Sequence, residues 1–168
     1  CVMELGGSDP FVVLDDADLN KAIPIAIASR FGNGGQTCIA AKRFILTPGI
    51  AYDFVTRFVE AAAELQVGDP NKDETTLAPM VRPDARDELH RQVLASVAAG
   101  ATLLIGGEKG AGVCDYPATI LDNVVPGVPA YSEELFGPVA SIIYAKDESD
   151  AIRIANDTAF GLAASIWT

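Results

Sequence analysis

The alternation of short apolar runs with longer amphipathic segments is the feature that most constrains the fold of this chain. Apolar runs of four to six residues, bounded by Gly, Pro or Asp, are typical of strands covered on both faces. Strands that alternate with helices imply a mostly parallel sheet with helices on its faces. We therefore predict an α/β fold, with strands at 11–14, 43–46, 101–105, 119–121, 139–144 and 163–167 and helices at 19–30, 51–65, 83–99 and 149–156.

Individual side chains refine these boundaries. Asp16 or Asp18 can cap the first helix, and Ser149 can cap the last one. Lys42 and Arg43 precede an apolar strand, where a charged pair is usually solvated, although such a pair could also attract an anionic substrate.

Composition excludes several classes of protein. The 168 residues fit one domain, and the 23 acidic against 12 basic residues give a formal charge of −11. Nucleic acid and anionic membranes are therefore not expected as partners. The sequence has no apolar run long enough to span a bilayer and starts without a signal peptide, so we expect a cytoplasmic protein. The three cysteines and single histidine indicate neither a disulfide framework nor a metal site.

Cys38 stands in the run Phe31-Gly-Asn-Gly-Gly-Gln-Thr-Cys38, where it is placed like a nucleophile. A cysteine attacks a carbonyl carbon as the thiolate, and glycines before it let the backbone approach a substrate and stabilise an oxyanion. The acidic element Glu4-Leu-Gly-Gly7 lies upstream, and a carboxylate elsewhere in the site could act as the general base. The alternative for Cys38 is a buried structural thiol. Cys1 and Cys114 lack such surroundings and are expected to be ordinary thiols.

Four motifs in order carry a resemblance to a known family. Together they span the chain, and they are Glu4-Leu-Gly-Gly7, Gly35-Gln-Thr-Cys38, Glu133-Glu-Leu-Phe-Gly-Pro-Val139 and Asn156-Asp-Thr-Ala-Phe-Gly-Leu-Ala163. In this respect the chain resembles the catalytic half of the aldehyde dehydrogenase superfamily, whose catalytic domain is Rossmann-like. Through residues 4–19 it is most similar to the succinate-semialdehyde dehydrogenase group.

The resemblance implies oxidation of an aldehyde to a carboxylic acid with NAD or NADP. Cys38 would form a thiohemiacetal and then a thioester, and its backbone N–H would hold the oxyanion. Glu4 would activate the water that hydrolyses the thioester. Thr37 and Ile39 would line the aldehyde pocket.

The resemblance also assigns cofactor contacts. Glu134 would bind the nicotinamide ribose, Phe136 would pack on the nicotinamide ring, and Leu5 and Gly6 would contact it through their backbone. The alternatives are that Glu134 belongs to a charged turn and that Phe136 is a core aromatic.

Residues 1–168 are expected to be part of a catalytic domain within a longer, two-domain protein that forms homo-oligomers. An upstream domain would bind the dinucleotide, so the isolated chain is expected to have no dehydrogenase activity. Two other functions remain open: a relative that transfers the acyl group to coenzyme A, and a dehydrogenase-like structural or regulatory module without catalysis. Retention of Glu4 favours hydrolysis over transfer to coenzyme A.

Overall fold

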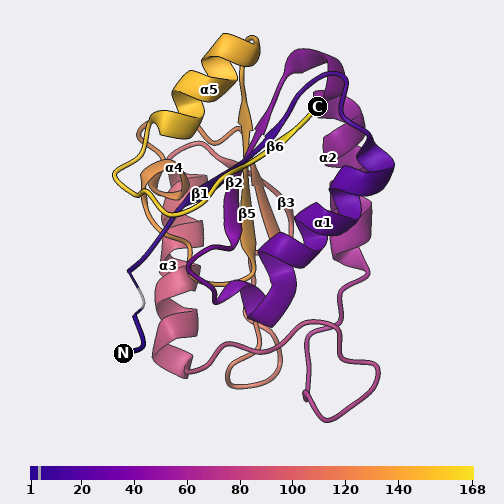
Figure 1. The fold of residues 1–168 in the computed structure, drawn as a ribbon. Helices are drawn as coiled ribbons and strands as arrows, with labels where there is room; N and C mark the ends of the chain where they lie inside the picture. The colour runs from indigo at the N-terminus through magenta and orange to yellow at the C-terminus, as the bar shows by residue number, and fades with distance from the viewer. Residues whose placement is uncertain (4) are drawn as a thin grey trace.

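A computed structural model describes residues 1–3 and 5–168 (Figure 1). In chain order the elements are β1 (Asp9–Val13), α1 (Leu19–Phe31), the 3₁₀ turn η1 (Gly32–Gly35), β2 (Ala41–Leu46), α2 (Pro48–Ala63), α3 (Pro83–Ala98), β3 (Thr102–Ile105), β4 (Thr119–Asp122), α4 (Pro129–Ser132), β5 (Val139–Tyr144), α5 (Glu148–Asn156) and β6 (Ser165–Trp167).

The strands of the described residues form one six-stranded sheet in the order β3-β4-β5-β2-β1-β6. All neighbouring pairs are parallel except β3 with β4, which is antiparallel. The prediction of an α/β fold with a mostly parallel sheet is confirmed. The expected strands and helices are present, with ends shifted by a few residues.

Two cores lie on opposite faces of the sheet because successive strand residues point to opposite sides. Phe11 of β1 and Phe44 of β2 belong to the core beneath α1 and α2, and the ring centroids of Phe44 and Phe58 are 4.7 Å apart. Val12 and Ile45, their neighbours in sequence, belong to the second core, which α3, α4 and α5 cover (Figure 1). Each fully buried side chain of this size contributes about 1.5–3 kcal/mol to folding, so the sheet is a rigid support for the loops at its ends.

Local details correct some of the sequence expectations. Asp18, one of the two expected caps, accepts a hydrogen bond from the backbone N–H of Asn20 and caps α1. Asp147, and not Ser149, caps α5, because its carboxylate accepts the N–H of Asp150 at 2.8 Å. The short helix α4 was not predicted, since four residues show no helical periodicity.

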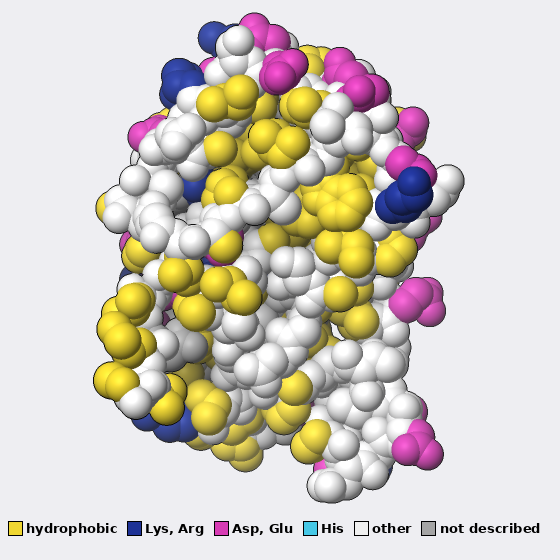
Figure 2. Space-filling model, viewed as in Figure 1, with side chains coloured by type: hydrophobic (Ala, Val, Ile, Leu, Met, Phe, Trp, Pro, Cys, Tyr) yellow, Lys and Arg dark blue, Asp and Glu magenta, His cyan; other side chains and the backbone are white. Residues whose placement is uncertain are grey.

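Strand β6 forms one edge of the sheet and lies beside β1. Leu162 and Ile166 are exposed here, and Figure 2 shows hydrophobic side chains on the face that β6 crosses in Figure 1. Among residues 1–3 and 5–168, no helix is both long and apolar enough to cross a membrane.

The amino ends of β1, β2, β5 and β6 lie at the same edge of the sheet, because these four strands are parallel. The loops that enter these strands therefore converge. They carry most of the residues that the sequence singled out.

Candidate active site

Cys38 lies on a tight turn between α1 and β2. Asn33, Gly34 and Gly35 have positive φ angles of 55°, 62° and 69°, so the chain reverses direction within η1. At Gly35 a Cβ atom would overlap the carbonyl group of Gly137 and would lie 2.6 Å from Nη2 of Arg30. Only glycine fits this position without strain, so the turn before Cys38 packs backbone to backbone against the loop that enters β5.

Gln36 fixes the turn to the segment before α3. Its Nε2 donates to the carbonyl oxygens of Asn33 at 3.1 Å and Pro79 at 3.3 Å, and its Oε1 accepts the N–H of Val81 at 2.8 Å. The side-chain amide is thus used at both ends. Gln36 was not predicted to have a role, although it stands two positions before Cys38.

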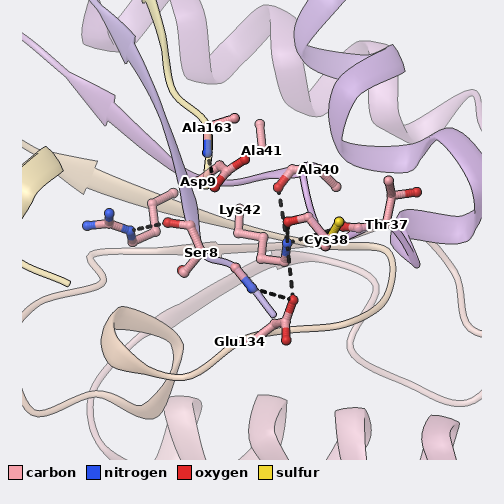
Figure 3. A network of polar contacts seen from close by, with 12 residues as sticks. Ser8, Asp9, Thr37, Cys38, Ala40, Ala41, Lys42, Glu134 and Ala163 are labelled. Carbon is pink, nitrogen blue, oxygen red and sulfur yellow. Dashed lines mark hydrogen bonds and ion pairs between the residues drawn. The ribbon is translucent and has the colours of Figure 1, made fainter. Parts of the chain in front are cut away.

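Two buried cations hold the carbonyl groups of the same turn. Nη2 of Arg30 donates to Gly35 O at 2.6 Å. Nζ of Lys42 donates to the carbonyl oxygens of Thr37 at 3.3 Å, Cys38 at 2.9 Å and Ala40 at 3.2 Å (Figure 3). The expectation that Lys42 is a solvated residue is wrong, because only 1% of it is exposed and the carbonyl groups of the turn take the place of water.

Burial changes the protonation of both cations. Loss of hydration lowers the pKa of Lys42 to about 8, and the nearby Arg30 lowers it further, whereas Glu134 and Asp9 oppose the shift. Burial also lowers the pKa of Arg30 to about 9, with Glu134 again opposing. Both groups carry their charge at neutral pH, and the turn before Cys38 therefore lies in a positive environment.

Arg43 is also buried, and the expectation that it is solvated is wrong for a similar reason. Its guanidinium group donates to the carbonyl oxygens of Ser8, Ile154 and Ala155, each at 2.9 Å. The last two belong to the final turn of α5, whose free carbonyl groups favour a cation. Arg43 thereby fixes the entry of β1 to the end of α5.

Glu134, on the loop before β5, faces the Cys38 turn. Its Oε1 accepts the N–H of Gly7 at 2.9 Å and lies 3.5 Å from Nζ of Lys42. Gln92 of α3 donates to the Glu134 carbonyl oxygen at 3.2 Å and to Oε2 of the neighbouring Glu133 at 2.9 Å. The loop before β5 is thus tied both to α3 and to the Cys38 turn.

The loop before β1 completes the cluster. Gly6 has a φ of 73°, and a Cβ atom there would lie 3.1 Å from Oε2 of Glu134. A Cβ atom at Gly7 would lie 2.6 Å from the carbonyl oxygen of Cys38. The two glycines therefore let this loop approach both Glu134 and Cys38.

The other residues that the sequence suggested lie on the same loops. Thr37, Cys38 and Phe136 are partly exposed, and Ile39 and Leu5 are 56% and 67% exposed. Glu4 lies outside the described residues. The structure thus brings together Cys38, Gly6 and Glu134, while Arg30, Gln36, Lys42 and Gln92 join them without having been predicted. The sequence could have suggested Lys42, since it follows Cys38 by only four residues.

Known proteins resemble this chain along its whole length. The model of the aldehyde dehydrogenase family matches residues 1–168. The succinate semialdehyde dehydrogenase [NAD(P)+] Sad of Escherichia coli is 57% identical over 169 residues, which are 100% of this chain and 37% of that relative. A succinate-semialdehyde dehydrogenase [NADP(+)] of Mycobacterium avium is 48% identical over 99% of the chain and 36% of its own length.

Solved structures show the same fold. The lactaldehyde dehydrogenase of Escherichia coli superimposes with a TM-score of 0.95 at 36% identity, over 98% of this chain and 35% of that one. The succinate-semialdehyde dehydrogenase of Burkholderia pseudomallei gives a TM-score of 0.94 at 37% identity, over 98% and 34%. The chain spans little more than a third of the length of the relatives it matches. With the family model matched over every residue, this chain belongs to the aldehyde dehydrogenase family.

Proposed function

We propose that this chain supplies the nucleophile and part of the cofactor site for NAD(P)-dependent oxidation of succinate semialdehyde to the carboxylic acid. The observation that supports this most is the convergence of Cys38, Gly6–Gly7 and Glu134 at one edge of the sheet. The name of the relative that is 57% identical favours succinate semialdehyde as the substrate.

Cys38 attacks the aldehyde carbon through its sulfur, and the carbonyl oxygen becomes the oxyanion of a thiohemiacetal. The backbone N–H of Cys38 stabilises this oxyanion, and the turn that carries it is already fixed by Gln36 and Lys42. A preformed donor of this kind needs no reorganisation during the reaction.

The residues of the loops before β1 and β5 fit the nicotinamide end of a dinucleotide. Oε1 of Glu134 is engaged by Gly7, while the absence of a Cβ atom at Gly6 keeps space open beside Oε2. Glu134 would accept ribose hydroxyl groups there, Phe136 would pack on the ring, and Leu5 and Gly6 would offer backbone contacts. A bound nicotinamide dinucleotide would supply the acceptor for the hydride that the thiohemiacetal carbon loses, and a thioester would then remain on Cys38.

Thr37 and Ile39 flank Cys38 in the sequence, are partly exposed and exposed, respectively, and are the proposed lining of the aldehyde pocket. Glu4 is the proposed base, which takes a proton from the water that attacks the thioester carbon. The acid then leaves, and the Cys38 thiolate is restored.

A graft tests this proposal because the chain covers only part of its relatives. Residues 1–168 replace the matching segment of Escherichia coli Sad, and aldehyde-dependent formation of reduced cofactor is followed with NAD and NADP. We expect Cys38→Ala to abolish turnover, whereas the matched Cys114→Ala variant retains it. An active Cys38→Ala graft would refute the role of Cys38.

The substrate and the base are tested separately. The same residues are also grafted into Escherichia coli lactaldehyde dehydrogenase, and a gain in relative rate with succinate semialdehyde over short aliphatic aldehydes supports the substrate proposal. Glu4→Gln should accumulate the thioester on Cys38, as seen by mass spectrometry. Turnover that requires coenzyme A would show that the acyl group is transferred to coenzyme A and not hydrolysed. Inactive grafts that still bind cofactor would favour the non-catalytic module.

A further inference from the structure

Lys42 takes part in no step of the proposed reaction, yet its ammonium group lies against the turn that carries the nucleophile. It projects from β2 and donates to the carbonyl oxygens of Thr37, Cys38 and Ala40 (Figure 3). Burying an ammonium group is unfavourable unless it is paired and hydrogen-bonded. Such a residue is expected to have a specific task in fixing the surrounding backbone.

These hydrogen bonds fix the direction of the Cys38 N–H, because of the geometry of the peptide group. A trans peptide is planar, so the carbonyl of one residue and the N–H of the next point in opposite directions. Lys42 holds the Thr37 carbonyl, which also accepts the N–H of Ala40 at 3.0 Å. The N–H of Cys38 belongs to the same peptide group and is therefore directed away from Lys42.

The same ammonium group connects the Cys38 turn with the loop before β5. It lies 3.5 Å from Oε1 of Glu134, which also accepts the N–H of Gly7. One cation thus contacts the turn that carries the nucleophile and the carboxylate proposed to bind the cofactor. Arg30 of α1 and Asp9 of β1 are the other charged groups that act on it.

We propose that Lys42 is a positioning residue that orients the backbone N–H of Cys38 toward the oxyanion and holds the Cys38 turn at a fixed distance from Glu134. This inference rests on the proposed function, since it assumes that an oxyanion forms at Cys38. Lys42 does not touch the substrate. It acts through the Thr37–Cys38 peptide group.

Two reactions of Cys38 separate this role from a general effect on the thiol. Alkylation by iodoacetamide displaces iodide at a saturated carbon and forms no oxyanion, whereas acylation by p-nitrophenyl acetate passes through a tetrahedral oxyanion before p-nitrophenolate leaves. Both are measured on the 168-residue chain with Cys1→Ser and Cys114→Ser as background. The mass of the peptide that carries Cys38 reports each product.

Lys42→Gln and Lys42→Met are compared with the wild type and with Lys21→Gln. Lys21 is a suitable control because its side chain is 78% exposed and, among the residues that the structure describes, pairs with Asp18 alone, at the start of α1. Losing one oxyanion donor lowers catalytic rates by about 10²–10³, and we expect misorientation of the donor to slow acylation by about tenfold or more. Alkylation should change far less, and Lys21→Gln should change neither rate.

Far-UV circular dichroism verifies that each variant is folded. Lys42→Gln retains two N–H donors and is the variant that should fold if Lys42→Met does not; if neither folds alone, both rates are measured in the Sad graft. Equal acylation rates in variant and wild type, or a parallel fall of acylation and alkylation, would overturn the role of Lys42 alone. A wild-type Cys38 that is alkylated but never acylated would overturn the proposed function as well.

Discussion

Replacing Gly35 by alanine should disrupt the contact that fixes the nucleophile turn. Gly35 has a φ of 69°, where an L-residue costs about 1–2 kcal/mol. The added Cβ atom would also overlap the Gly137 carbonyl group and approach Nη2 of Arg30 to 2.6 Å. Overpacking of a buried position costs about 1–3 kcal/mol, so Gly35→Ala should lower the free energy of unfolding by about 2–5 kcal/mol in all.

Urea unfolding of the 168-residue chain measures this loss. Trp167, the single tryptophan, stacks on Phe11 with ring centroids 5.5 Å apart and reports on the sheet, while far-UV circular dichroism reports on the helices. Gly32→Ala is the matched control in the same turn, because Gly32 has a φ of −54° and its added Cβ would meet no heavy atom within 4 Å among the described residues outside its own turn. A Gly35→Ala variant within about 0.5 kcal/mol of wild type would refute the reasoning.

Two further predictions concern the buried cations. Burial lowers the pKa of Lys42 from 10.5 to about 8, so the unfolded chain binds this proton more tightly than the folded chain. As pH rises from about 8 to 10.5, Lys42 loses its proton in the folded chain first, and the folded chain no longer has to bury a charge. The unfolding free energy of the wild type relative to Lys42→Gln should thus increase by about 2 kcal/mol between about pH 7 and 9.5, and a flat or falling difference in urea titrations would contradict this. Arg43→Met should lower the unfolding free energy by about 3 kcal/mol or more, since three carbonyl groups lose their donor; the exposed Arg91→Met is its control, and equal urea midpoints would contradict it.

The elements of the fold could be predicted because their signals are local. Runs such as 43–46 and 139–144 carry enough apolar residues to be recognised as strands without knowledge of their neighbours. The antiparallel pairing of β3 with β4 could not be derived, since pairing depends on residues distant in sequence. The cap of α5 was predicted wrongly for a simpler reason. Asp147 and Ser149 both have side chains that can cap a helix, and backbone angles decide which of them does so.

For the candidate site, the sequence indicated the residues that we propose to carry the chemistry but missed those that hold them in place. Cys38 and Glu134 stand in recognisable motifs, and the structure brings their loops together. Lys42 and Arg43 were wrongly predicted to be solvated, because charged residues beside a strand are usually exposed to solvent. Lys42 donates to carbonyl groups of the turn just before it, and Arg43 to carbonyl groups distant in sequence, and residue type reveals neither set of backbone partners in advance.

The central position of β5 has a consequence for the order of folding. Gly7 and Glu134 are 127 residues apart along the chain, and β5, which follows Glu134, lies between β2 and β4 in the sheet. Contacts between such distant segments are costly in loop entropy and tend to form slowly. The reactive surroundings of Cys38 should therefore mature in the last phase of refolding, so a nascent chain would carry only an ordinary thiol until its sheet is complete.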